Sequence, residues 1–546
     1  DAFAGVINII TKSGQDIDAV EAGVRAGSFN TQQAWGQYGG RHNDWETMAS
    51  VEVGSTDGDD PFIETDLQSQ LDAVFASNAS QAPGRALTGY KSVDIRLEAK
   101  SEHLTARLGY QGVFDNNAAV GIAGALDPQG QFRSDRASTD ISYRRDDPAS
   151  DWVWTTRFNA LYVSQISTQD ARLFPPGAFG GAFPDGMIGS PGYKELQAGL
   201  EQQGLYSGFD RHRIRLVVGG LWGDVYQTTD KVNFDINIDP LLGVVFSPRG
   251  ALVDVSDTAD VWLPERDRSV VYAAVQDEWQ LAKRWQLTSG LRYDHYSDFG
   301  DTINPRLALV WATTDNWTSR LLYGRAFRAP SFEELYVTSN PVGLGDPDLN
   351  PEIIDTVELA FSWRDDRERN AGINLFYFDI DDYIERVPNG VAGQNQSAND
   401  GARRGQGVEV EGGMPLFTGL RFSANYAWVY VEDKRSGDDV GEAPGQQAYL
   451  ALDWQFASFW QLGTQLNWFG RIERTAGDNR DPIDSAAVLD MTLRRIKLFN
   501  RAELAVRLRN VLDQNYVAPS PGPAATIPGD YPQPGINGDV SFRYRF

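Results

Sequence analysis

Apolar and polar side chains alternate with a period of two along several segments of about ten residues. The segments 285–294, 407–412 and 501–509 all show this alternation. In the last ten residues, "NGDVSFRYRF", one face carries Val540, Phe542, Tyr544 and Phe546 and the other carries Asp539, Ser541, Arg543 and Arg545. Successive side chains of a β-strand point to opposite faces, so a period of two indicates strands. The chain is therefore predicted to be all-β.

Strand length and the position of aromatic residues separate two kinds of all-β protein. In a soluble sandwich, the apolar faces of two sheets pack against each other. A tilted strand of about 9–11 residues can instead cross a bilayer, with aromatic residues at its ends. An Arg on the lipid face at mid-membrane would cost about 2–4 kcal/mol, so a bilayer enforces strict segregation of charge. The segments show this segregation, which favours a transmembrane β-barrel over a sandwich.

Hydropathy agrees with a barrel. The mean hydropathy is −0.40, and no run approaches the ~20 apolar residues of a membrane helix. Only alternate residues of a barrel strand meet lipid, so a low average is expected. Aromatic residues make up 12% of the chain, and it has 54 Gly. This combination fits a barrel with aromatic girdles.

Composition and motifs exclude several functions. The net charge of −26 disfavours a nucleic-acid-binding groove. Cysteine is absent, which removes disulfides, thiolate metal sites and cysteine nucleophiles. No GxSxG, HExxH or P-loop motif is present, so the chain is predicted not to be an enzyme. A soluble or secreted β-rich enzyme, a third class of protein, would need catalytic residues that are not visible.

Short and long connections alternate between the predicted strands, as in outer-membrane barrels with short periplasmic turns and long extracellular loops. Counting through this alternation gives about 22 antiparallel strands, the first near 20–28 and the last at 537–546. A barrel of this width encloses a lumen of the kind found in plugged transporters. The predicted long connections are 57–88, 115–136, 166–200, 224–268, 327–352, 381–405, 433–445, 473–485 and 512–536.

Several motifs, in order along the chain, resemble the TonB-dependent outer-membrane receptor family of the ferric-siderophore and cobalamin type. "DAFAGVINIITK" resembles the last strand of that family's plug domain. "GRAFRAPSFEELY" followed by "GDPDLNPEIIDTVELAF" resembles the segment around the seventh external loop. "GVEVEG", "RNVLDQNY" and the terminal "FRYRF" also match. The resemblance implies a multi-pass barrel in the outer membrane of a Gram-negative bacterium.

The resemblance also implies a division of the chain. Residues 1–16, with a short strand from Gly5 to Thr11, are expected to be the C-terminal end of a plug domain, and residues 17–546 the barrel. The family's signal peptide, TonB box and remaining plug are absent from this sequence, so a fragment is expected rather than a natural plugless pore. The aromatic residues Phe542, Tyr544 and Phe546 look like the signal for barrel insertion.

Ligand contacts are expected at the outer rim. Arg328 and Tyr336 near "FRAP" are predicted contacts, as are Arg403 and Arg404, because Arg pairs with anionic groups of a chelate. The loop "RLFPPGAFGGAFPDGM" adds Phe174, Phe179 and Phe183 as pocket-forming aromatics. In the alternative, Arg328 is architectural and pairs with a carboxylate of the barrel wall. The inward-facing residues Glu409, Glu411, Arg507 and Arg543 are expected to contact the plug or fill the polar lumen.

Two acidic runs of the sequence are candidates for metal binding. The run "DGDD" supplies Asp57, Asp59 and Asp60, and "DIDD" at 379–382 supplies more carboxylates, as a calcium site would need. Solvated acidic loops are the favoured alternative, so no cofactor is predicted beyond possible structural Ca²⁺. The interval after "FRAP" has no His, and the four His residues lie at turns or on the lipid side, which disfavours haem.

These observations predict a receptor for energy-coupled uptake of a scarce nutrient, with a ferric siderophore as the first choice. Cobalamin, haem or a saccharide are alternatives in the same class, and a passive porin or structural barrel is the alternative from another class. The resemblance implies coupling to the TonB–ExbB–ExbD complex through the missing N-terminal region. It also implies contact with outer-membrane lipid and lipopolysaccharide, the barrel assembly machinery and a small chelate, with no nucleic acid. A monomer is expected.

Overall fold

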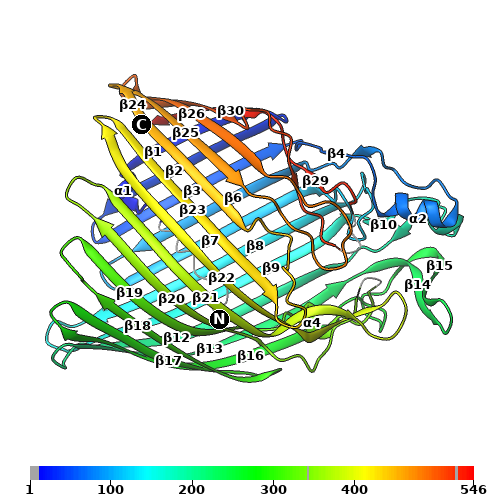
Figure 1. The fold of residues 1–546 in the computed structure, drawn as a ribbon, viewed down its shortest axis with the longest axis horizontal. Helices are drawn as coiled ribbons and strands as arrows, with labels where there is room; N and C mark the ends of the chain where they lie inside the picture. Colours follow the sequence, from blue (N-terminus) through cyan, green and yellow to red (C-terminus); the bar gives the residue numbers. More distant parts are fainter. Residues whose placement is uncertain (1–10, 341–342, 523–526) are drawn as a thin grey trace.

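The computed structural model describes residues 11–340, 343–522 and 527–546, and within them 22 strands form one antiparallel sheet (Figure 1). The sheet closes on itself where β1 (Ala19–Gly27) pairs with β30 (Asn537–Arg545), with Val24 opposite Phe542. The predicted strand number and the predicted first and last strands are confirmed. Among the described residues, no helix combines the length and the hydropathy of a membrane span.

The other barrel strands follow one another in chain order around the ring. In the first half they are β2 (Thr31–His42), β3 (Trp45–Thr56), β6 (Tyr90–Lys100), β7 (Leu104–Asn117), β8 (Gln131–Asp146), β9 (Trp152–Gln169), β12 (Gly192–Tyr206), β13 (His212–Thr229), β16 (Arg266–Ala282) and β17 (Trp285–Tyr296). In the second half they are β18 (Gly300–Trp311), β19 (Trp317–Arg328), β20 (Glu352–Arg364), β21 (Asn370–Pro388), β22 (Asn395–Phe417), β23 (Leu420–Asp433), β24 (Gln446–Ala457), β25 (Trp460–Phe469), β26 (Ala486–Leu498) and β27 (Ala502–Arg509).

Smaller elements lie outside the sheet. The helices are α1 (Gly14–Ile17), α2 (Leu67–Phe75), α3 (Ala178–Gly181) and α4 (Phe332–Tyr336). Short strand pairs join β4 (Phe62–Ile63) to β5 (Gly84–Arg85), β10 (Arg172–Phe174) to β11 (Met187–Ile188), β14 (Lys231–Asp239) to β15 (Gly243–Asp254), and β28 (Val517–Ala518) to β29 (Tyr531–Pro532).

The connections separate into a loop-bearing end, which we call the outer end, and an end of short turns, as predicted (Figure 1). The sequence-based boundaries were wrong in two respects. Several strands extend further outward than predicted, so the run at 379–382 lies in β21 and not in a loop. Two outer connections are also short. The outer connections are 28–30, 57–89, 118–130, 170–191, 230–265, 297–299, 329–351, 389–394, 434–445, 470–485 and 510–536.

The outward face of the strands is apolar and exposed, as a lipid-facing surface must be. Val53, Leu97, Val218 and Ile303 are each more than a third exposed. Trp side chains gather beside the short turns, where Trp285 stacks on Trp311 with ring centroids 4.9 Å apart. Aromatic residues in this position form the interfacial girdle of a membrane barrel.

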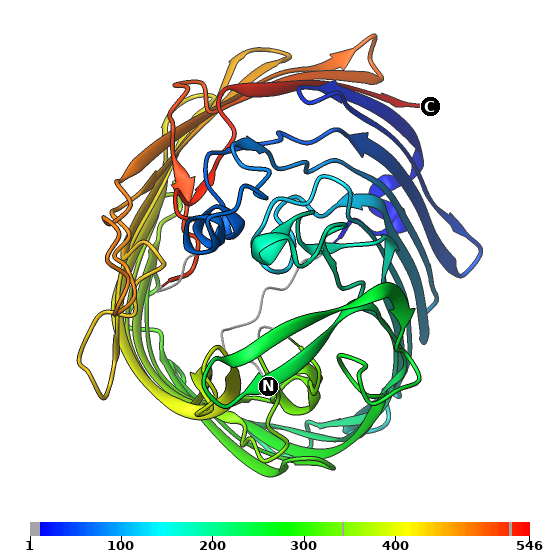
Figure 2. The same ribbon diagram turned by 90° about the vertical axis from the view of Figure 1, so that its right-hand side faces the viewer.

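A cluster of buried apolar residues lies in the outer loops and not in the barrel. It includes Leu173, Phe183, Met187, Phe234 and Val255, which come from connections far apart in the sequence. The β14–β15 hairpin lies across part of the barrel opening (Figure 2). The outer loops therefore form a packed layer above the lumen.

The hairpin is fixed near its turn. The backbone N–H of Val244 donates to the carbonyl oxygen of Ala392 over 2.9 Å, which joins the hairpin to the 389–394 connection. Gly243 has φ +79°, and a Cβ at this position would lie 2.1 Å from that same oxygen. Only glycine combines this backbone conformation with so close an approach.

The predicted plug strand from Gly5 to Thr11 falls largely on residues 1–10, outside the described residues. The described segment that follows forms α1, which spans the predicted domain boundary at residue 16. Its Gln15 backbone N–H donates to the Glu46 carboxylate over 2.9 Å, so α1 is held against β3. Ser13 caps the helix by accepting from the Asp16 N–H.

Candidate functional site

The inner wall of the barrel is polar. A cavity of about 1260 Å³ lies inside the sheet. Its walls carry charged residues from many strands, including Glu201, Arg215, Glu278, Arg292, Arg306, Glu358 and Glu409. These charges lie on the strand faces opposite to lipid, so the lumen can hold water or a folded polar segment.

The four predicted lumen residues lie on this wall. Glu409 lines the lumen cavity, and Glu409 and Glu411 both line a smaller cavity beside it. Arg507 donates to Asp539, with 2.8 Å between the closest nitrogen and oxygen, and Arg543 donates to Glu503 over 2.7 Å. The two arginines thus bind strands of the wall to one another, and the two glutamates stay open to the lumen.

A second cavity, of about 530 Å³, lies among the outer loops. We call it the rim cavity, and it is lined by Ile122, Phe132, Gln165, Leu173, Gly189, Pro191, Gly192, Tyr193, Asp230, Val232, Phe234, Asp235, Ile236, Arg249, Asp260, Trp262, Glu333, Ser339, Asn340 and Arg386. One wall is the β14–β15 hairpin, and α4 contributes another edge. Aromatic rings and charged groups thus meet in one space large enough for a small ligand.

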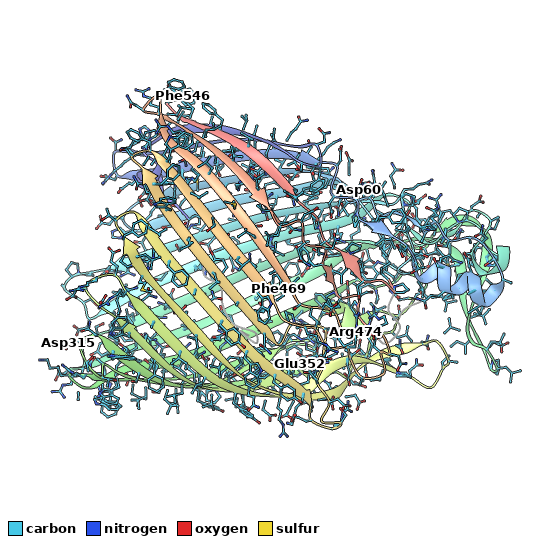
Figure 3. The ribbon with its side chains drawn as sticks, turned by 45° about the horizontal axis from the view of Figure 1, so that its top comes forward. Asp60, Asp315, Glu352, Phe469, Arg474 and Phe546 are labelled. Carbon is cyan, nitrogen blue, oxygen red and sulfur yellow. The ribbon has the colours of Figure 1, made fainter. Side chains whose placement is uncertain are left out.

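Arg328 is fully engaged by carboxylates. Its Nε and Nη2 atoms donate to Glu352 over 2.6 Å each, and Nη1 and Nη2 donate to Glu334 over 2.9 and 3.0 Å. Glu352 is 1% exposed and also accepts from the Ile384 N–H. This is the arrangement that the architectural alternative predicts, in which Arg328 joins the wall to α4. Figure 3 shows Glu352 at the loop-bearing end of the barrel.

Tyr336 lies at the end of α4, beside the rim. The guanidinium of Arg266 lies 5.2 Å from the centre of its ring. Burial raises the pKa of the Tyr336 hydroxyl above its ordinary value. The ring packs against the apolar cluster of Val225, Leu263 and Val337. Tyr336 is thus placed beside the rim cavity but does not line it.

The three predicted loop aromatics form part of the loop core. Phe183 is 1% exposed and Phe174 is 7% exposed. Phe179 packs edge-on against both rings, with centroid distances of 5.8 and 4.9 Å. In this structure their rings hold the outer loops together and do not line the rim cavity. Their role as ligand contacts stays a prediction.

Arg403 and Arg404 lie within β22 and not in a loop. The guanidinium of Arg403 lies 3.8 Å from the ring centre of Tyr383, and Arg404 lies 3.5 Å from Glu432. Both side chains are therefore held by neighbouring strands. The structure does not bring them together with the rim cavity.

The acidic run at 57–60 is held by its own loop. The Thr88 N–H donates to the Asp60 carboxylate over 2.9 Å, and the Thr88 hydroxyl donates to Asp59 over 3.1 Å. Within the described residues, no group of three or more His, Cys, Asp or Glu side chains converges as a metal site would need. In Figure 3, Asp60 lies at the loop-bearing end and Asp315 at the opposite end.

Sequence reasoning missed the rim cavity residues Asp230 and Trp262. Asp230 is one of seven acidic residues between positions 230 and 265, so nothing in the local pattern distinguishes it. Its burial arises from packing between connections that are distant in the sequence. An isolated Trp among charged residues, as in "DVWLPER", is the one signal that could have suggested a pocket wall.

The chain is similar to outer-membrane proteins of known sequence. A family model described as "TonB dependent receptor-like, beta-barrel" matches residues 85–511. The iron-regulated outer membrane virulence protein of Vibrio cholerae is 28% identical over 262 residues, which cover 44% of this chain and 40% of that protein. The matched region is thus under half the length of that curated relative.

Two further similarities concern a transporter and a receptor. The vitamin B12 transporter of Vibrio cholerae is 24% identical over 276 residues, 48% of this chain and 41% of the transporter. A crystal structure of a variant ferric enterobactin receptor from Pseudomonas aeruginosa, in complex with enterobactin, superposes with a TM-score of 0.73. That match has 17% sequence identity and covers 96% of this chain and 81% of the other, which shows a shared fold.

Proposed function

This chain belongs to the TonB-dependent receptor family, and from that premise we propose that the protein imports a ferric siderophore through the outer membrane. The family's proteins are receptors and transporters, not enzymes, and the chain is a multi-pass outer-membrane barrel. The observation that carries the ferric substrate is the 28% identity to the iron-regulated protein of Vibrio cholerae. The ferric enterobactin receptor of Pseudomonas aeruginosa, 28% identical over 223 residues, supports the same substrate class.

The geometry supports a two-stage route. The rim cavity offers an external place for capture, and the polar lumen lies inside the barrel wall. Glu409 and Glu411, together with the ion-paired Arg507 and Arg543, would contact a plug that occupies the lumen. Residues 1–16 are proposed as the end of that plug, and energy would come from the TonB–ExbB–ExbD complex acting on it.

The remaining partners belong to the same proposal. Outer-membrane lipid and lipopolysaccharide would surround a monomeric barrel, and the barrel assembly machinery would read Phe542, Tyr544 and Phe546. Structural Ca²⁺ at Asp57, Asp59 and Asp60 stays a prediction. A chelator of Ca²⁺ should lower the melting temperature if the ion is bound, and an unchanged melting temperature would reject it.

Iron-dependent expression and uptake test the proposal. Outer membranes from cells grown with and without an iron chelator should show strong induction of the protein on iron depletion. Uptake of ⁵⁵Fe as a ferric siderophore should fall when the gene is deleted and also when TonB is deleted. Uptake that persists without TonB would instead support a passive pore.

Cobalamin is the second candidate because the vitamin B12 transporter of Vibrio cholerae matches 48% of the chain. Growth that depends on this protein under cobalamin limitation, with no effect of iron on its abundance, would favour that substrate. Growth with a saccharide or with haem as the limiting nutrient tests those two substrates in the same way.

A further inference from the structure

The charges around the rim cavity do not cancel. Four carboxylates line it, from Asp230, Asp235, Asp260 and Glu333, against the two guanidinium groups of Arg249 and Arg386. Arg249 is already used, since it donates to Asp235 over 2.6 Å and to Asp260 over 2.5 Å. The cavity therefore keeps an excess of negative charge after its internal ion pairs are counted.

Asp230 is a buried carboxylate without a full set of partners. The residue is 5% exposed, and its Oδ1 has no hydrogen-bond partner among the described residues. Its backbone is fixed, because the Asp230 N–H donates to the Ser256 hydroxyl over 3.1 Å and the Val255 N–H donates to its carbonyl. Burial raises the pKa of the Asp230 carboxyl to about 6, so it is mainly ionised at neutral pH. Buried unpaired carboxylates are costly, and a ligand donor would relieve that cost.

Trp262, which lines the same cavity, has an unpaired hydrogen-bond donor. Its Nε1 is buried and has no acceptor within the part of the chain that the structure describes. The ring packs edge-on against Tyr193, with centroids 6.5 Å apart. The unpaired acceptor and the unpaired donor thus belong to two residues that line one space, which also has aromatic walls.

A protonated amine satisfies these surroundings better than an anion does. An ammonium group donates strong hydrogen bonds to a carboxylate and is attracted to aromatic faces. An oxygen atom of the same ligand could accept from the Trp262 indole N–H. A catecholate chelate brings negative charge and would face the carboxylate excess instead.

The charge of the outer connections also favours a cationic ligand. The outer connections contain 30 Asp and Glu residues against 9 Lys and Arg residues, a formal charge of −21 out of −26 for the chain. A surface of one sign concentrates ligands of the opposite sign and raises their association rate. The loop layer therefore favours the approach of cationic ligands over anionic ones.

We propose that the rim cavity recognises a protonated amine on the imported chelate, with Asp230 as its acceptor and Trp262 as a donor to a ligand oxygen. This inference rests on the proposed function and narrows its substrate class to amine-bearing, cationic or zwitterionic chelates. It sets this chain apart from a receptor that selects a highly anionic ferric catecholate.

A matched pair of ferric chelates tests the proposal. Ferrioxamine B is a ferric trihydroxamate with one protonated amine, and its N-acetyl derivative lacks that charge. The detergent-solubilised protein should bind the amine form about 10- to 100-fold more tightly in equilibrium titrations. Equal affinities for the two chelates would overturn the proposal.

Variants locate the effect in the cavity. Asp230→Asn should abolish the preference for the amine form and leave the affinity for the acetylated form unchanged. Asp257→Asn is the control, because Asp257 is exposed in the same connection and does not line the cavity. Trp262→Phe should weaken both chelates by about 3- to 10-fold and keep their ratio, as loss of one hydrogen bond predicts. If Asp230→Asn still prefers the amine form, Asp230 is not the acceptor of the amine. If Trp262→Phe binds both chelates as tightly as the wild type, the Trp262 indole does not bind the ligand.

Further titrations separate this inference from the proposed function. If ferric enterobactin binds and the amine gives no advantage, the amine site is wrong and ferric-siderophore uptake stands. If the metal-free amine chelate binds as tightly as the ferric form, and this binding depends on Asp230, the amine site is supported and the ferric substrate is rejected. If none of these chelates binds, the amine site is overturned. Migration of unboiled samples on a gel confirms that each variant retains a closed barrel.

Discussion

Two groups of buried charges lie in the outer loops, and they are built in opposite ways. In the first, Arg474 and Arg480 both donate to Asp530, over 2.6 and 2.8 Å, and Arg480 also donates to Asp478 over 2.6 Å. In the second, the rim cavity, Asp230 is buried, and one of its carboxylate oxygens is unpaired among the described residues. Figure 3 shows Arg474 among the loops above the barrel wall.

The difference shows that buried carboxylates can serve either stability or ligand binding, according to whether the protein pairs them. The first group, which we call the paired cluster, joins the 470–485 connection to the 510–536 connection, and the Ser520 N–H also donates to Asp530 over 2.9 Å. Every carboxylate in it is satisfied, so it has nothing to offer a ligand. The rim cavity keeps an unsatisfied acceptor at a cost in stability, which a ligand can offset.

The largest effect is expected from breaking the paired cluster. Asp530→Ala leaves Arg474, whose side chain is 9% exposed, without its carboxylate and removes one of the two carboxylates that bind Arg480. It should destabilise the two connections by about 3–5 kcal/mol. Hydrogen exchange should rise in segments 470–485 and 510–522. Asp481→Ala is the control, because its side chain is exposed and forms no ion pair within the described ranges. Equal exchange in the two variants would show that the pairing is not what holds these connections.

A smaller loss is expected at the rim arginine. Arg328→Lys keeps the charge but cannot reproduce the two bidentate contacts with Glu334 and Glu352. The free energy of unfolding should fall by about 2–3 kcal/mol, as loss of charged hydrogen bonds predicts. Arg404→Lys is the control, since Arg404 has one longer contact, at 3.5 Å from Glu432. If Arg328→Lys reduces ligand binding without reducing stability, the architectural interpretation of Arg328 is wrong.

Removing the unpaired charge of Asp230 should stabilise the protein, whereas the two preceding substitutions destabilise it. Asp230→Asn should stabilise the unliganded protein by about 1–3 kcal/mol at pH 7, because it removes the cost of a buried anion. The pKa of Asp230 is raised from 3.8 to about 6, so this cost appears as pH rises through that range. The difference in melting temperature between variant and wild type should therefore disappear below about pH 4. Destabilisation at pH 7 would show that Asp230 has a partner in the native protein.

The paired cluster should respond to pH in the reverse direction. The hydrogen bonds from Arg480 lower the pKa of Asp478 from 3.8 to about 2. Its stabilisation is complete above the unfolded value and is lost as pH falls toward 2. Acid should therefore destabilise the paired cluster, while it removes the cost of the buried Asp230 anion in the rim cavity. Hydrogen exchange of the two regions, compared at pH 3 and pH 7, would distinguish these opposite effects.

The smallest effect concerns the hairpin that walls the rim cavity. Gly243→Ala and Gly250→Ala both place a side chain at positive φ, which costs about 1 kcal/mol. Only the first also meets the Ala392 carbonyl oxygen, since position 250 has open space. Gly243→Ala alone should therefore expose the hairpin to protease and weaken amine binding. Identical behaviour of the two variants would mean that contact with the 389–394 connection does not hold the hairpin.

The barrel could be predicted from the sequence because each strand carries its own alternating pattern. A strand such as β30 alternates lipid-facing Val540 and Phe542 with lumen-facing Asp539 and Arg543, and this pattern is local. The number of strands and both seam strands followed from it. The strand ends were harder, because beyond the membrane the alternation no longer has a bilayer to enforce it, as at 379–382.

The sites were less accessible because burial in the loops is not local. Phe174 and Phe183 are typical of pocket-forming aromatics by type, but they pack with Val255 in the loop core. Asp230 is an ordinary acidic residue by sequence, and only the meeting of the 170–191 and 230–265 connections buries it. Pairing of Arg328 with a carboxylate of the barrel wall was an alternative in the sequence analysis. The structure supplies that carboxylate from Glu352, which begins β20 just as Arg328 ends β19.

The seam between β1 and β30 has a consequence for assembly. It joins residues more than 500 positions apart, as in the hydrogen bond from the Gly538 N–H to Ser28. Until that contact forms, the sheet has two open edges, and open edges invite pairing with other chains. Contacts of such sequence separation also form slowly, because loop closure costs entropy first. Ring closure by nine C-terminal residues therefore ends the period in which the newly made chain is prone to aggregate.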